Sequence, residues 1–302
     1  MDFLKQLIEG IALGGVYALI ALGYTMVYGV LGLINFAHSD VFMIGAYTGV
    51  FASGWLGYTA ANGHHGGLGA AVLVMIASMA VCTTLGMVIE RFAYRPVRGA
   101  PKLTPLVTAI AVSMLVQNAG VLMFGSTPRA FPAVIRTTLV RLGPITTTNV
   151  KLIDLTAALV LMGGLTLLVQ RTRVGKAMRA IATNPDAARL MGIPTDRIIA
   201  LTFGIGSALA GAGGVLFGLD QPRVEPLMGM QPGLKAFVAA VLGGIGNIPG
   251  AMLGGLVIGV VEQISAAFLS SSFAPAIVFS ILVAVLLLRP QGLLGRVSRE
   301  KV

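Results

Sequence analysis

Charged residues are scarce in this sequence, and their scarcity excludes a soluble protein. Only 11% of the 302 residues are charged, 56% are hydrophobic, and the mean hydropathy is +0.90. A soluble domain has about 25% charged residues. Uncharged runs longer than about 18 residues recur, and each is long enough to cross a bilayer core of about 30 Å as a helix. Because these runs are too long and too uniformly apolar for barrel strands, the composition predicts an all-α polytopic membrane protein.

Cysteine, histidine and catalytic motifs are also rare. Cys82 is the single cysteine, which excludes a disulfide framework or a cysteine-based metal cluster. The phosphate-binding motif G-x-x-x-x-G-K-[ST] is absent, as are HExxH and GxSxG. His64 and His65 lie in a loop without nearby carboxylates and are interpreted as surface residues. We therefore expect no catalytic residues, no metal and no cofactor bound by this chain.

The basic residues that are present have an uneven distribution. They give a net charge of +10, and 14 of the 21 fall in three short segments, 90–102, 170–197 and 289–302. Cytoplasmic loops of membrane proteins concentrate Lys and Arg in this way. The charge therefore indicates cytosolic loops and a cytoplasmic C-terminus rather than nucleic-acid binding. The segment 125–151, which we expect on the opposite side, is an exception with four basic residues.

Two interruptions break the apolar pattern of what we expect to be a single transmembrane domain over residues 1–302. We expect about eight transmembrane helices in two pseudo-repeated halves, with broken or re-entrant segments at about 29–45 and 234–250. The first contains INFAHSD, and the second contains GGIGNIPG, whose glycines and proline disrupt helix geometry. Paired interruptions of this kind indicate a translocation pathway in transporters. The candidate pathway residues are Asn35, Phe36, His38, Asp40, Gly243, Gly244, Gly246 and Asn247. The alternative is that both segments are tight packing turns.

The segment 170–197 must face water, because it carries six basic residues between two long apolar runs. The residues VGKAMRAIA predict a helix, Asn184-Pro185 ends it or starts the next piece, and a second short helix follows from Asp186. Gly192 is expected to close this second helix, and Asp186 suits its positive N-terminal end. An amphipathic loop that lies on the lipid headgroups is the alternative.

Within this segment, Asp186-Ala187-Ala188-x-x-x-Gly192 resembles the E-A-A-x-x-x-G coupling loop of ABC importer permeases, with Asp in place of Glu. Over nearly the whole chain, the sequence more closely resembles permeases of branched-chain amino-acid importers. The stretches that carry this resemblance are 15–19 (GVYAL), 24–29 (YTMVYG), 34–40 (INFAHSD), 93–99 (AYRPVRG), 233–255 (GLKAFVAAVLGGIGNIPGAMLGG) and 289–296 (RPQGLLGR). The sequence departs from the family at Ser39, where Gly is more common.

The resemblance implies half of a translocation pathway in a bacterial inner membrane. It implies a homologous second permease, a periplasmic substrate-binding protein and two cytosolic ATPase subunits that use ATP and Mg. The candidate coupling residues are Gly175, Arg179, Asn184, Asp186, Ala187, Ala188 and Gly192. A related permease for urea or short-chain amides is an alternative. A secondary transporter, with Asp40 and Glu262 as candidate ion sites, is another, and it leaves the coupling motif unexplained.

Overall fold

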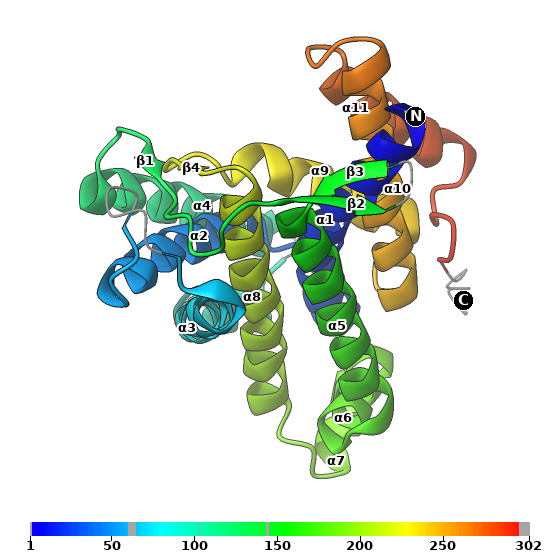
Figure 1. The fold of residues 1–302 in the computed structure, drawn as a ribbon. Helices are drawn as coiled ribbons and strands as arrows, with labels where there is room; N and C mark the ends of the chain where they lie inside the picture. The colour runs from blue at the N-terminus through cyan, green and yellow to red at the C-terminus, as the bar shows by residue number, and fades with distance from the viewer. Residues whose placement is uncertain (1, 60–64, 102, 143–144, 296–302) are drawn as a thin grey trace.

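The computed structural model describes residues 2–59, 65–101, 103–142 and 145–295, and they form a helical protein (Figure 1). Short strand pairs accompany the helices. Strand β1 (Arg129–Ala130) pairs with β4 (Arg223–Val224), and β2 (Leu139–Leu142) pairs with β3 (Ile145–Thr148). The helices are α1 (Asp2–Leu31), α2 (His38–Trp55), α3 (Gly67–Ile89), α4 (Leu103–Phe124), α5 (Asn149–Arg171), α6 (Arg173–Thr183), α7 (Pro185–Leu190), α8 (Thr195–Asp220), α9 (Met230–Gly243), α10 (Ile248–Phe268) and α11 (Ala274–Leu288).

Within the part of the chain that the structure describes, six helices are long and apolar enough to cross a membrane: α1, α3, α4, α5, α8 and α10. The shorter α2, α9 and α11 add to them, so the all-helical polytopic fold is confirmed. The segment expected as a basic loop after residue 89 differs from the prediction. It continues α3 through a π-helical turn (Glu90–Tyr94) and a 3-10 turn (Arg95–Val97) before the chain leaves the helix.

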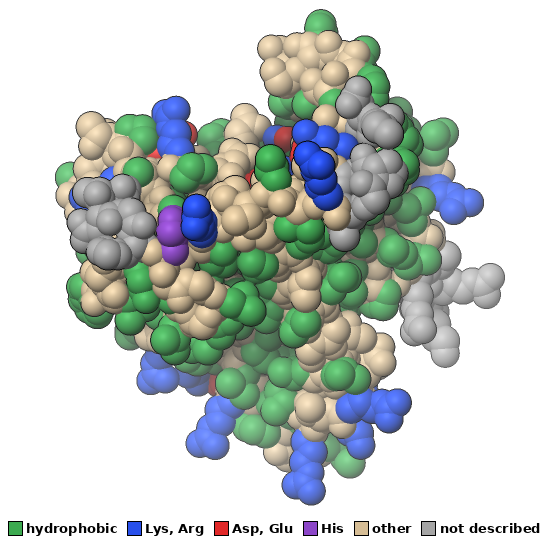
Figure 2. Space-filling model, viewed as in Figure 1, with side chains coloured by type: hydrophobic (Ala, Val, Ile, Leu, Met, Phe, Trp, Pro, Cys, Tyr) green, Lys and Arg blue, Asp and Glu red, His purple; other side chains and the backbone are tan. Residues whose placement is uncertain are grey.

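The exterior of the bundle matches a lipid environment. α3, α4 and α5 have only a minority of their residues buried, whereas α1 and α8 are buried along most of their length. In Figure 2, apolar side chains cover the middle of the molecule, and Lys and Arg gather toward its two ends. A bilayer therefore solvates the middle band, while the charged ends face water.

The structure describes only one of the two histidines in the predicted loop between α2 and α3. His64 lies outside the described residues. His65 is exposed, and its Nδ1 atom lies 2.7 Å from the carbonyl oxygen of Ala133. The interpretation of His65 as a surface residue is therefore confirmed.

Close contact between α1 and α10 organises the centre of the fold. The Gly10-x-x-x-Gly14 spacing, typical of close helix approach, faces α10, where Gly255 and Gly259 supply the matching small residues. A Cβ atom on Gly14 would lie 2.7 Å from the Cα atom of Leu256. The two backbones touch because small residues remove the side chains between them, as in other membrane helix pairs.

A helix ends within each of the two predicted segments, because residues 32–37 separate α1 from α2 and residues 244–247 separate α9 from α10. α9 and α10 are separated by residues 244–247, where Gly244 (φ +99°) and Gly246 (φ +92°) adopt a backbone that favours glycine. The residues after α11 fold back onto this break, because the amides of Leu293 and Leu294 donate to the carbonyls of Leu242 and Gly243. The segment expected as a simple basic tail therefore begins as part of the packed structure.

Candidate coupling and translocation site

The helical arm formed by α6 and α7 begins at a tight joint with α5. The Thr172 hydroxyl caps α6 by accepting from the amide of Gly175 at 3.1 Å. Gly175 packs directly on the end of α5, where a Cβ atom would collide with the carbonyl oxygen of Leu168. Arg179 donates to the carbonyl of Val169. These contacts fix α6 against the end of α5.

α7 forms as the sequence predicts. The Asn184 side chain accepts from the amides of Asp186 and Ala187, each at 3.0 Å, and satisfies two donors that the first turn leaves open. Gly192 ends the turn with φ +78°. Ala188 is buried against the bundle, whereas the Asp186 side chain is 90% exposed. The motif therefore builds a short helix with one attached face and one free face.

The tip of the arm exposes apolar side chains, which the motif alone did not indicate. Leu190 is 89% exposed and Met191 is 82% exposed, next to the basic Arg189. In Figure 1, α6 and α7 extend from one end of the bundle, away from its core. These two adjacent exposed apolar residues make the tip of the arm a candidate contact surface. The sequence signal for this exposed tip was the presence of two large apolar residues, Leu190 and Met191, within a basic segment.

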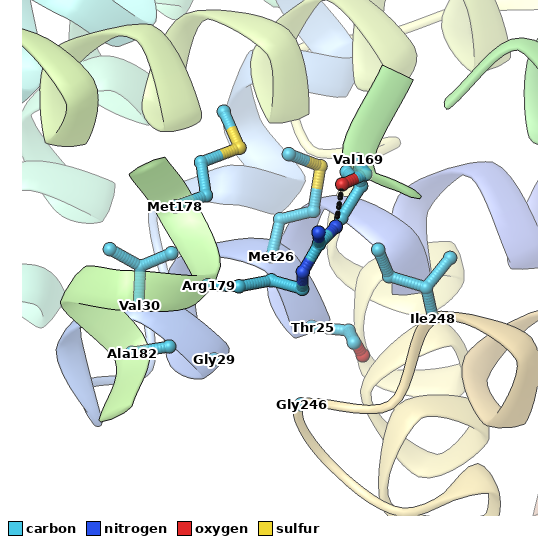
Figure 3. Close-up of a pocket in the computed structure, with 10 residues that line it drawn as sticks. All are labelled: Thr25, Met26, Gly29, Val30, Val169, Met178, Arg179, Ala182, Gly246 and Ile248. Atoms are coloured by element: carbon cyan, nitrogen blue, oxygen red, sulfur yellow. Dashed lines mark hydrogen bonds between the residues drawn. The ribbon is translucent and has the colours of Figure 1, made fainter. Parts of the chain in front are cut away.

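One cavity brings the arm and the second broken segment together (Figure 3). It measures about 80 Å³ and adjoins a larger cavity of about 780 Å³. Arg179 and Ala182 line it from α6, Gly29 lines it from α1, and Gly246 lines it from the break. A Cβ atom on Gly29 would lie 3.5 Å from the Cα atom of Gly246, so α1 and the break approach closely here.

The predicted pathway residues of the second broken segment divide into two groups. Gly246 and Asn247 line the larger cavity. Asn247 also caps α10 and donates to the carbonyl of Leu294 at 2.6 Å. Gly243 and Gly244 are packed instead against Gly250 and the returning C-terminal segment. Their contacts are those of close backbone packing.

INFAHSD forms a buried junction whose side chains point to different helices. Asn35 accepts from the Tyr94 hydroxyl at 2.8 Å, and the His38 ring lies 5.0 Å from the ring of Tyr24. Asp40 accepts from Ser113 at 2.5 Å and from Gln117 at 2.9 Å, both on α4. Phe36 lies against Phe237 of α9, with ring centroids 6.2 Å apart. The cavity with Gly246 is lined by other residues, so a pathway role for the INFAHSD residues stays a prediction.

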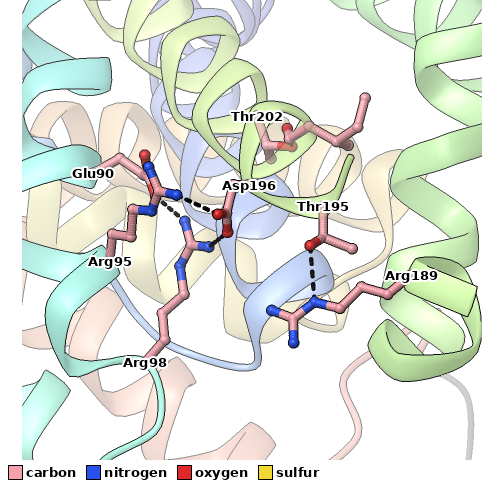
Figure 4. Close-up of polar contacts among 8 residues, drawn as sticks. Glu90, Arg95, Arg98, Arg189, Thr195, Asp196 and Thr202 are labelled. Atoms are coloured by element: carbon pink, nitrogen blue, oxygen red, sulfur yellow. Dashed lines mark hydrogen bonds and ion pairs between the residues drawn. The ribbon is translucent and has the colours of Figure 1, made fainter. Parts of the chain in front are cut away.

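A cluster of ion pairs joins the end of α3 to the start of α8 (Figure 4). Arg98 pairs with Glu90 and, at 2.9 Å, with Asp196, which also pairs with Arg95. Burial lowers the pKa of Arg98, and the Asp196 carboxylate acts against this shift. Sequence analysis identified these basic residues only as loop charges and did not single out their acidic partners.

The same cluster is adjacent to the arm. The Arg189 side chain of α7 donates to the Thr195 hydroxyl at 3.1 Å, and Thr195 precedes Asp196 at the start of α8. The arm is therefore held at both ends, by α5 and by α8. Fold and site together define a polytopic membrane protein of the transport class, with a water-facing arm joined to a cavity at a broken helix.

Comparison with known proteins identifies the family. Residues 6–289 match the family described as the permease component of branched-chain amino acid transport systems. The chain is 42% identical to the high-affinity branched-chain amino acid permease BraD of Pseudomonas aeruginosa, with 99% of this chain and 98% of BraD covered. It is also 42% identical to LivH of Escherichia coli K12, at the same coverage. The chain belongs to this permease family.

A more distant relative shows how far the similarity extends to other permeases. The nucleoside ABC transporter permease NupB of Lactococcus lactis is 30% identical over 142 residues, which cover 46% of this chain and 38% of NupB. The likeness to BraD and LivH is both higher and nearly complete in length.

Proposed function

We propose that this chain is the permease subunit of an ATP-driven importer of branched-chain amino acids and forms half of its translocation pathway. The observation that carries the proposal is the 42% identity to BraD and LivH over 99% of the chain. Both relatives are named as high-affinity branched-chain amino acid permeases, and neither likeness is confined to one segment.

The arm formed by α6 and α7 is the element that contacts the ATPase. Its free surface carries Leu190 and Met191, and its attached surface carries Ala188, so a partner can bind one side while the other stays on the bundle. A movement of the arm reaches the cavity at Gly246 through Arg179. The glycines of the break allow the backbone to change conformation there at low cost.

The assembly contains a homologous second permease, two cytosolic ATPase subunits that use ATP and Mg, and a periplasmic binding protein. The arm, the Glu90–Arg98–Asp196 cluster and the C-terminus lie on the cytosolic side of the inner membrane. Two observations support one common side: basic residues are concentrated in these segments, and the residues after α11 pack on the break that lines the same cavity as α6.

Purification in mild detergent, with mass spectrometry of the bound proteins, tests this proposal. We expect stoichiometric ATPase subunits and a second permease. Ala187→Glu is the matched variant, because it places a charge on the exposed face of α7 and leaves the membrane helices unchanged. This variant should insert normally and fail to retain the ATPase. Purification of the wild-type chain alone would contradict the proposal.

A further inference from the structure

A polar cavity lies on the other side of the bundle from the arm, and its charged residues have no assigned role. It measures about 420 Å³ and is lined by α1, the end of α8, the β4 segment, α9 and α10. Tyr17 lies at the floor of this cavity, and Gly29 lines the cavity beside the arm. The two residues are about 18 Å apart along α1, at about 1.5 Å per residue. In Figure 1, β4 and α9 lie at the end of the molecule opposite to α6 and α7.

The floor of this cavity is a mostly buried ion pair. The Lys235 ammonium donates to Glu262 at 2.7 Å, and the Tyr17 hydroxyl donates to the other carboxylate oxygen at 2.9 Å. The Lys235 and Glu262 side chains are only 10% and 15% exposed, yet both line the cavity. Charges are expensive within a membrane protein, and where they occur they mark substrate or ion pathways.

The charge balance of the cavity selects the class of ligand. A second pair at the rim joins Arg223 to Glu225 at 3.1 Å, so the cavity holds two positive and two negative side chains. A ligand with a net charge would leave the occupied cavity with one charge that nothing compensates. A zwitterion preserves it, since its ammonium faces a carboxylate and its carboxylate faces an ammonium.

We propose that this cavity binds the zwitterionic head group of an α-amino acid, antiparallel to the Lys235–Glu262 pair. The substrate carboxylate accepts from Lys235, which keeps donors beyond the one used by Glu262, and the substrate ammonium donates to Glu262. The ammonium and carboxylate of an α-amino acid are about as close as the two members of an ion pair. The inference rests on the proposed function, for which it names the substrate-recognising residues.

One part of the cavity wall suits an apolar substrate side chain. Leu13, Phe217, Leu227 and Met228 line it beside the ion pair. Ligand cavities are about 300–1,000 Å³ and combine apolar walls with a few well-placed polar groups. Leucine, isoleucine or valine provides this combination of a charged head and an apolar branch. Urea or a short amide lacks both the opposite charges and the branch.

Cysteine protection tests the inference on the permease itself. The only native cysteine, Cys82, is fully buried, whereas Leu227 is 56% exposed at the cavity. Leu227→Cys should react with a polar maleimide, and leucine should slow this reaction by tenfold or more at saturation. Leucinamide, which lacks the carboxylate, and 4-methylpentanoate, which lacks the ammonium, should protect much less. Equal protection by all three, or none by leucine, would overturn the proposal.

A paired variant separates recognition from structure. Lys235→Met combined with Glu262→Gln removes both charges at once and leaves no unpaired buried charge. Lys5→Met, which removes an exposed cation of α1, is the control. In proteoliposomes with the whole transporter, the paired variant should reduce leucine uptake by tenfold or more. The Lys5→Met control should leave uptake and ATP hydrolysis within about twofold of wild type, and the paired variant should still assemble with the ATPase subunits and the binding protein.

The other outcomes are decisive as well. Uptake equal to wild type would overturn the inference and leave the proposed function intact. Parallel loss of uptake, ATP hydrolysis and assembly would assign the pair a structural role, and weaker attachment of the binding protein would assign the cavity to docking; either result overturns the inference. Wild-type vesicles that import no branched-chain amino acid would instead refute the proposed function.

Discussion

Replacement of Asn184 by alanine isolates the contribution of α7 to coupling. The Asn184 side chain accepts two backbone hydrogen bonds at the start of a helix that spans only Pro185–Leu190. Loss of such a cap costs about 1 kcal/mol, within a range of about 0.5–2. Because about 1.4 kcal/mol corresponds to a tenfold change, the ordered form of α7 should become about fivefold less favourable. A partner that binds ordered α7 should then bind about fivefold more weakly.

The assay measures ATP hydrolysed per leucine imported in proteoliposomes, together with the affinity of the purified ATPase for the permease. Asn184→Ser retains a capping oxygen and is the matched control, while Asn184→Gly should fall between serine and alanine. Membrane insertion should be equal in all three variants, because Asn184 is exposed and lies outside the spans. Unchanged affinity in the alanine variant, or a serine variant as weak as alanine, would refute the assignment of α7 as the coupling helix.

Three further predictions address packing, docking and the pathway. Gly14→Ala should destabilise the protein by about 1–3 kcal/mol because its Cβ would lie 2.7 Å from the Cα atom of Leu256. The control Gly163→Ala, whose Cβ would have nothing within 4 Å, should be neutral or stabilising. Thermal unfolding in detergent measures both variants, and equal melting temperatures would contradict the α1–α10 contact. Leu190→Asp should weaken ATPase binding by about tenfold or more, as expected for an exposed apolar contact residue, and unaltered binding in a pull-down would exclude this surface. Asp40→Ala should lower the maximal rate of leucine uptake if INFAHSD belongs to the pathway, whereas unchanged uptake kinetics would favour a packing turn.

Local sequence rules predicted the arm and the breaks well. A polar residue before proline, a short helix and a terminal glycine are determined by neighbouring residues, so Asn184 and Gly192 could be placed from the sequence. Gly244 and Gly246 likewise interrupt their helix through their own backbone conformations. Neighbouring residues therefore account for α7 and for the position of the break, although the C-terminal segment also packs on the break.

Long-range pairing could not be read from the same rules. Glu262 meets Lys235 and Tyr17 only because α1, α9 and α10 pack together, and Asp196 meets Arg98 only because α3 and α8 converge. The return of the C-terminal segment to Leu242 is another contact between distant residues. A single sequence gives the identity of each charge but not the distance between them, so the ion pairs required the structure.

Leucine uptake by the reconstituted assembly is the measurement that tests the central claim most directly. The vesicles should contain this chain with its second permease and ATPase subunits, and uptake should be compared with internal or external ATP, with an ion gradient alone and with excess urea. The account predicts leucine uptake that requires ATP on the side of the membrane where the arm lies and the binding protein on the opposite side. Excess urea should not inhibit this uptake. Leucine import driven by an ion gradient without ATP would contradict it.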